Sequence, residues 1–238
     1  MASRKEQKEQ LRRERQAREA SASEAAKRRR LIGYAVGGGV VVLAVIVAVA
    51  LLAGGGDSGS AASGDVLPGD GSVPEIREVA NVAAGAKAGS CELKSFVAKT
   101  REHLASLDDK VTYASKPPTS GSHYQTPAED NAYSEAPNAK ELVHTLEHGR
   151  IVIWFKKNLP AEQRASLKAY YDEDPYQIVL VPDETGMTYD VAATAWNRDP
   201  QPNGTGRLLG CRRFNDGVFT AIEAFKDEHR SRGPEPVP

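Results

Sequence analysis

The chain has 238 residues and a formal net charge of −1, and this near-neutral total conceals two oppositely charged parts. Residues 1–30 hold 11 Lys and Arg against 5 Asp and Glu, a net charge of +6, so the rest of the chain carries −7. A mildly acidic main part argues against nucleic-acid binding, which needs clustered basic surfaces.

The basic segment, residues 1–30, is rich in Arg, Lys, Glu, Gln and Ala, which favour a helix. No apolar residues repeat at helical spacing along it, so we expect a solvated, partly helical tail that packs on no core. Beside a membrane such a tail favours anionic lipid headgroups, by about 1 kcal/mol for each Lys or Arg near the surface. The sequence identifies no protein partner.

Residues 31–53 contain no charged side chain. As a helix they reach roughly 34 Å, enough for a hydrocarbon core of about 30 Å. The alternative is a cleaved signal peptide, but its apolar region spans about 7–15 residues, so the length here favours an uncleaved single-pass transmembrane helix. Arg28, Arg29 and Arg30 adjoin the span, whereas the next Lys or Arg after it is Arg77. This asymmetry predicts a cytoplasmic N-terminus and an extracytoplasmic domain, attached to the cell membrane.

Cys91 and Cys211 are the two cysteines, and both follow the apolar span. In an oxidising compartment an even number of cysteines favours a disulfide. The long loop that it would close corresponds to at most about 4–5 kcal/mol of stabilisation. Two free thiols or a redox pair are the alternatives, but neither cysteine lies in a C-x-x-C motif, so we expect a structural disulfide.

Residues 54–74 have the Gly/Ser/Asp composition of a flexible linker, and residues 75–238 are of the size of one domain. The apolar patterns in that domain predict an α+β fold, in which a sheet with the element order β-α-β-β-α is covered by helices. The expected elements, in chain order, are a helix or irregular arm at 91–107, a short strand at 111–114, a loop at 116–122, a helix at 139–147, a strand at 151–155, a helix at 161–171, strands at 177–181 and 188–196, and a helix at 214–229.

The helix expected at 139–147 carries the sequence HTLEH, with His144 and His148 one turn apart and Glu147 beside them. Both imidazoles can then reach one ion, and the pattern H-x-x-E-H is that of inverted zinc peptidases. The surroundings do not favour a peptidase, because Gly149 ends the helix and a strand follows at once. The alternative is a helix face with hydrogen-bonded histidines near its C-terminus.

His123 is a further candidate ligand. It follows the sequence PPTSG, in which proline and glycine can hold a side chain in a fixed direction, and loops on a rigid scaffold often carry functional groups. The alternative for this residue is an ordinary histidine of a surface loop.

The segments KPPTSGSHY (116–124), ELVHTLEHGRIVIWF (141–155) and AATAWN (192–197), with the closing helix, resemble a family of bacterial, largely actinobacterial, membrane proteins. The family is catalogued as domain of unknown function 3105, and the resemblance covers roughly residues 85–235. It implies that His123, His144, Glu147 and His148 belong to the family signature, and that His103 matches another histidine of the pattern. The family usually has proline where this chain has Ser122.

With the resemblance, the sequence favours a membrane-anchored extracytoplasmic protein that binds Cu or Zn through His123, His144 and His148, with His103 as a fourth candidate. Met187, whose thioether would favour Cu(I), is more simply a loop residue. The first alternative is a zinc hydrolase with Glu147 as general base, but the sequence supports no assignment of catalytic residues. The second is an envelope interaction module whose histidines form a polar network without metal.

Overall fold

The computed structural model describes residues 67–235. The basic tail and the apolar span expected at 31–53 lie outside these residues. No helix within the described part is long and apolar enough to cross a membrane.

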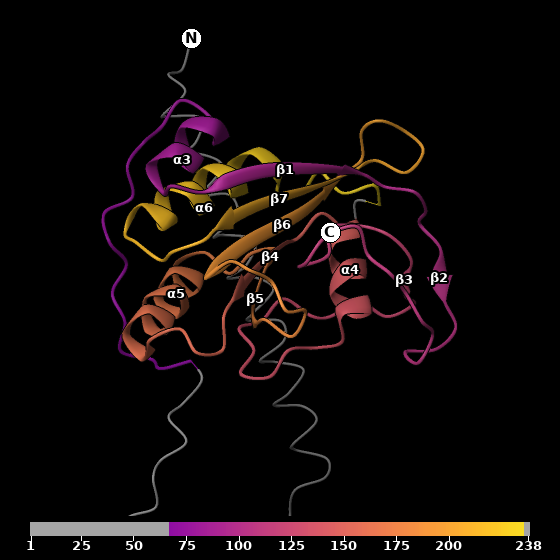
Figure 1. Ribbon diagram of the computed structural model, residues 1–238, viewed down its shortest axis with the longest axis horizontal. Coiled ribbons are helices and arrows are strands. Elements are labelled where there is room, and N and C mark those ends of the chain that lie inside the picture. The colour runs from indigo at the N-terminus through magenta and orange to yellow at the C-terminus, as the bar shows by residue number, and fades with distance from the viewer. Residues whose placement is uncertain (1–66, 236–238) are drawn as a thin grey trace, which may run out of the picture. The chain divides into compact units, whose positions relative to one another are not determined.

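The described chain folds as a mixed α+β domain around a five-stranded sheet (Figure 1). The strand order is β1-β7-β6-β4-β5; neighbouring strands are antiparallel except for the parallel pair β4 and β5. A separate parallel pair is formed by β2 and β3. The elements are α3 (Val82–Ala88), β1 (Glu92–Val97), β2 (His103–Leu104), β3 (His123–Tyr124), α4 (Ala139–Glu147), β4 (Ile151–Phe155), α5 (Ala161–Glu173), β5 (Ile178–Pro182), β6 (Val191–Asn197), β7 (Thr205–Cys211) and α6 (Gly217–His229).

Side chains alternate between two cores, one on each face of the sheet. In β4, Ile153 and Phe155 point to a core that also holds side chains of α5 and α6, whereas Val152 and Trp154 point to a core that includes α4. The helices α3, α5 and α6 therefore cover one face, and α4 covers the other (Figure 1). Trp154 of β4 and Trp196 of β6 are fully buried in the core on the α4 face.

The predicted elements from 139 onward are confirmed within a few residues, but the sheet is larger than expected. The segment expected as a helix or arm contains the edge strand β1, and β7 was not predicted. Residues 111–114 form no strand in the described chain. In the segment expected as a linker, Leu67 is buried in the core that contains α5 and α6, so packing begins before residue 75.

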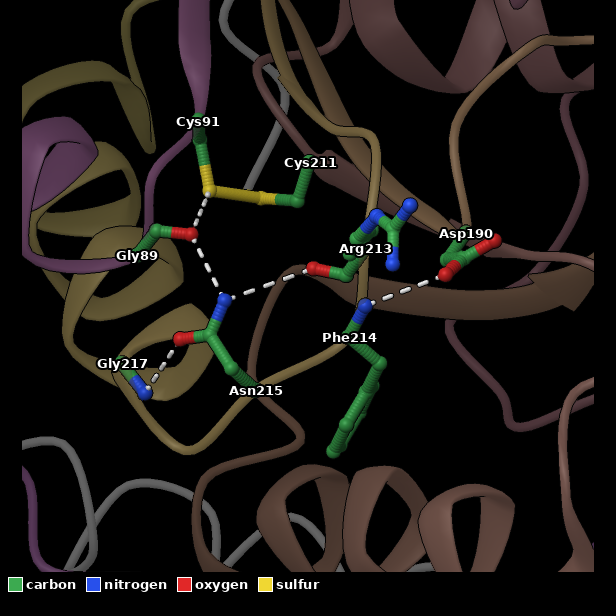
Figure 2. The surroundings of a disulfide bond; sticks show 8 residues. All are labelled: Gly89, Cys91, Asp190, Cys211, Arg213, Phe214, Asn215 and Gly217. Carbon is green, nitrogen blue, oxygen red and sulfur yellow. Dashed lines mark hydrogen bonds between the residues drawn. A yellow bond between two sulfur atoms is a disulfide. The ribbon is translucent and has the colours of Figure 1, made fainter.

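The predicted disulfide between Cys91 and Cys211 is present. Glu92, the first residue of β1, pairs with Gly210 of β7. Cys91 precedes Glu92 and Cys211 follows Gly210, so the antiparallel register brings the two cysteines together. Beside the bond, Asn215 Nδ2 donates to the carbonyl of Gly89 at 3.0 Å (Figure 2). The disulfide thus joins the edge strand to its neighbour where the loop into α6 begins.

Candidate metal centre

Helix α4 is fixed at both ends, and this holds its last turn in place. At its start, the Asn138 side chain accepts from Lys140 N and the Glu141 carboxylate accepts from Asn138 N, which together form a capping box. At its end, Gly149 has φ +84°, and a Cβ there would lie 2.9 Å from the backbone nitrogen of Gly233. The prediction that this glycine follows the helix is confirmed.

The loop before His123 is buried rather than exposed. Pro117, Pro118, Thr119 and Ser120 are all buried, and a Cβ on Gly206 of β7 would lie 2.6 Å from the Cβ of Thr119. A glycine in the central sheet therefore lets the loop lie directly on β7. His123 continues from this loop into β3 and is fully buried, so it is not the surface-loop histidine of the alternative interpretation.

Four side chains place one potential ligand atom each within 4.8 Å of all the others: His103, His123, His144 and Glu147. They come from β2, β3 and α4, and the parallel register sets His103 directly beside His123. The last three residues are buried, whereas the His103 side chain is 42% exposed. Three of the four side chains are therefore shielded from solvent, and the cluster contacts solvent through His103.

Hydrogen bonds to backbone carbonyls fix the tautomers of two histidines. His123 Nδ1 lies 2.8 Å from the carbonyl oxygen of Gly121, and His144 Nδ1 lies 2.6 Å from that of Tyr124. Because a carbonyl oxygen can only accept, both Nδ1 atoms carry a proton, and each neutral ring has its lone pair at Nε2. This outer contact is the usual support of a metal-bound histidine.

Two buried atoms in the cluster face each other without a hydrogen bond. His123 Nε2 lies 2.9 Å from Glu147 Oε2, but the atoms are not aligned for a hydrogen bond, and neither has another hydrogen-bond partner among the described residues. A lone pair and a carboxylate oxygen at this distance repel unless a positive charge, a proton or a metal ion, lies between them.

Glu147 is held in its ionised form. Burial acts to raise the pKa of Glu147, but its contact with His123, in the form that places a positive charge between the two groups, and its contact with Arg101 outweigh burial and lower the pKa to about 2. Arg101 Nε donates to Glu147 Oε1 at 2.6 Å, which leaves Oε2 facing the histidines. Burial lowers the pKa of His144 to about 4, so this ring is neutral at pH 7.

His148 lies beside the cluster. It occupies the C-cap of α4, and its Nε2 is 3.0 Å from Nε2 of His144. Since His144 has its lone pair at Nε2, His148 donates this hydrogen bond. Burial lowers the pKa of His148 as well. His144 and His148 are therefore in contact, as the HTLEH spacing predicted. His148 occupies the Nε2 lone pair of His144 that a metal ion would use.

The structure brings together His103, His123 and His144, which were predicted ligands, and adds Glu147, which was predicted only as the base of a hydrolase. The sequence feature that could have indicated Glu147 as a ligand is its position between the two histidines of HTLEH. Arg101 was not singled out, and no motif marks it. Met187 lies in the loop between β5 and β6, as expected, and its side chain is buried in the core on the α4 face.

The sequence model of the family described as "Protein of unknown function (DUF3105)" matches residues 105–237, more than half of the chain. This range contains His123, His144, Glu147 and His148, whereas His103 precedes it. No curated protein and no solved structure matches the chain.

Proposed function

We propose that this chain, which belongs to the family of unknown function DUF3105, binds a transition metal ion through its buried histidine and glutamate cluster. The ligands are His103, His123, His144 and Glu147. The observation that carries the proposal is the buried, unpaired contact between His123 Nε2 and Glu147 Oε2. A cation there would satisfy both atoms, which otherwise remain buried without partners.

The donor set indicates the kind of metal. Three imidazole nitrogens and one carboxylate oxygen suit Zn(II) or Cu(II), whereas Ca²⁺ and Mg²⁺ prefer oxygen ligands throughout. Two atoms that each lie about 2.0–2.1 Å from a zinc ion are at most about 4.2 Å apart. The largest separation in the cluster is 4.8 Å, so small side-chain rotations bring all four atoms within range of one ion.

His103 gives the site a route to solvent, and His148 competes with a metal ion for a ligand atom. His148 bonds to the Nε2 lone pair of His144, so a metal ion must displace this hydrogen bond or take His148 as a ligand. His103 is the most exposed member of the cluster. This arrangement supports a site that exchanges its metal, as a carrier or sensor does.

The geometry supports metal binding better than hydrolysis. A general base must be free to take a proton at a pKa near the working pH. Glu147 is fully buried, accepts a hydrogen bond from Arg101 and has its pKa lowered to about 2, so it is a poor proton acceptor. Histidines that serve packing alone would have their ring nitrogens paired to protein groups, but His123 Nε2 has no hydrogen-bond partner among the described residues, and it lies in a group of four potential ligand atoms within 4.8 Å of one another.

The test is the metal content of the purified full-length chain, measured by elemental mass spectrometry before and after incubation with Zn(II) or Cu(II). We expect close to one ion per chain, and loss of that ion in a His123→Gln/His144→Gln variant. His229→Asn is the matched control, because His229 is also a buried histidine but lies outside the cluster. A parent that takes up neither metal, or a double variant that is folded by circular dichroism and retains the ion, would overturn the proposal.

We also propose that residues 31–53 anchor the domain outside the cell membrane, with the basic tail against anionic lipid in the cytoplasm. The uncharged stretch and its arginine-rich N-terminal flank support this topology. The Cys91–Cys211 disulfide is typical of an oxidising compartment. Protease added to intact spheroplasts should degrade the domain and spare a tag on the N-terminus, and the reverse pattern would refute the orientation.

A further inference from the structure

A second site, made by residues outside the metal cluster, lies where β6 ends. A cavity of about 390 Å³ is lined by Asn197, Arg198, Asp199, Arg207 and Arg232. These residues come from the end of β6, the turn after it, the neighbouring strand β7 and the segment after α6. The volume lies within the range of small-molecule sites, which is roughly 300–1,000 Å³.

The cavity is strongly basic for a domain that is acidic as a whole. The lining residues include three arginines and a single carboxylate residue, Asp199, which gives the lining a net charge of +2. The effect reaches the neighbouring His229, whose pKa is lowered to about 4 by burial and, in addition, by the charges of Arg207 and Arg232. Such a lining attracts anions, and guanidinium is the side chain best suited to bind phosphate or carboxylate with two hydrogen bonds.

Two buried polar atoms of the lining have no hydrogen-bond partner in the described part of the chain. One is a donor, Arg207 Nε, and the other is an acceptor, Asn197 Oδ1. Both side chains are held by their remaining atoms: Arg207 Nη1 donates to Ser95 Oγ at 2.7 Å, and Asn197 Nδ2 lies 3.1 Å from His229 Nδ1. Unpaired buried atoms on fixed side chains indicate a missing partner.

Backbone contacts also hold the rim of the cavity. Arg198 N donates to the carbonyl of Arg232 at 2.8 Å, which keeps these two exposed arginines side by side. Thr205 Oγ1 donates to the carbonyl of Asp199 at 2.9 Å and ties the turn to the start of β7. The arginines are thus presented by a fixed backbone and not by a free tail.

We propose that this cavity binds a small phosphate monoester. The doubly charged phosphate matches the +2 lining, and its oxygens accept from Arg207 Nε and from the two rim arginines. Asn197 Oδ1 requires a proton donor, which a hydroxyl group of the ligand or a singly protonated phosphate supplies. The volume leaves room for a small organic group beyond the phosphate.

The experiment is a calorimetric titration of the purified full-length chain with inorganic phosphate, glycerol phosphate and sulfate at pH 7. We expect saturable binding of both phosphates, with sulfate at least tenfold weaker because it has no proton to offer Asn197 Oδ1. No binding of either phosphate at about 10 mM, tenfold above a millimolar dissociation constant, would overturn the proposal. Equal affinity for sulfate would overturn the role given to Asn197.

The variants separate this cavity from general charge effects. Arg198→Gln/Arg232→Gln removes two exposed side chains and should lower the phosphate affinity at least tenfold without unfolding the domain. Arg77→Gln/Arg213→Gln removes the same charge at exposed positions that do not line the cavity, and should leave affinity within twofold. Equal losses in both variants would mean that the cavity is not the site.

A phosphate monoester can be a free metabolite or a lipid headgroup, and a soluble short-chain phosphatidic acid distinguishes the two. Tighter binding of glycerol phosphate than of this lipid identifies a soluble ligand, and the reverse order identifies a headgroup. Either order supports the phosphate site if the rim variant abolishes it.

Discussion

The ring of Trp196 packs edge-on against the ring of His123, with 5.8 Å between the ring centroids. Trp196 Nε1 donates to the carbonyl of Asn203 at 2.7 Å, so the indole is fixed by the turn that follows β6. The next residue, Asn197, lines the arginine cavity. The end of β6 therefore supports the histidine and glutamate cluster with one side chain and the proposed phosphate site with the next.

Replacing Glu147 by Gln should separate metal binding from stability. The amide keeps the volume of the buried carboxylate, and its nitrogen can donate to His123 Nε2, which has no hydrogen-bond partner in the described chain. Because Arg101 loses its charged partner, we expect the free energy of unfolding of the metal-free protein to fall by about 1–3 kcal/mol, with the domain still folded. Zn(II) affinity should fall at least tenfold, because the anionic ligand is lost. Chemical denaturation and metal titration measure the two effects, and unchanged affinity would exclude Glu147 as a ligand.

Replacing Gly206 by Ala should disturb the metal cluster from a distance. The added methyl group would overlap the Thr119 side chain, so the buried loop that leads to His123 must move. We expect a destabilisation of about 1–3 kcal/mol by overpacking, together with weaker metal binding. Gly69→Ala is the control, since a Cβ there meets nothing within 4 Å. Weaker metal binding in both variants would argue against a specific role of the loop.

Replacing both Cys91 and Cys211 by Ala should lower the free energy of unfolding by about 2–5 kcal/mol, because the disulfide closes a long loop. Cys211 belongs to the core on the face opposite α4, so Zn(II) affinity of the folded variant should stay within twofold. Denaturation of the parent with and without a reducing agent provides an independent measure of the same bond. A loss of metal binding in the folded variant would show that the cluster depends on the position of β1.

The elements that the sequence predicted correctly are those whose own apolar pattern identifies them. The run IVIWF is fully buried in β4, and α4 has the predicted bounds because Asn138 and Gly149 mark its ends. The two strands of the five-stranded sheet that were not predicted, β1 and β7, lack such a pattern. Most of β1 is exposed at the sheet edge, and β7 contains Gly206 and Gly210, which are typical of loops. Gly210 in fact makes room for the Tyr189 ring, which depends on tertiary packing and cannot be read from local sequence.

The sequence predicted which histidines form the candidate site, but not how they are arranged in space. Helical spacing placed His144 beside His148, and they are in contact. The spacing could not show that Glu147 faces His123, because β3 and its buried loop come from a distant part of the sequence. The arginine cavity had no local signal, since its members are scattered over β6, β7 and the segment after α6.

The stability of the domain should depend on pH through His229. This side chain is buried at the end of α6, with its pKa lowered to about 4 from an ordinary value of 6.5. Between these values the unfolded chain binds a proton that the folded chain does not, so stability is complete above pH 6.5 and falls as the pH decreases toward 4. For His229 the loss amounts to at most about 3 kcal/mol.

His144 has the same depressed pKa and contributes to the same pH window, so a comparison of variants must isolate His229. His229→Asn keeps an acceptor for Asn197 Nδ2 and removes the titrating group. Urea denaturation at pH 7 and at pH 4.5 should show a smaller decrease in stability for the variant than for the parent, both without metal. Equal decreases would mean that His229 is protonated in the folded protein at pH 4.5, and that its burial does not hold it neutral.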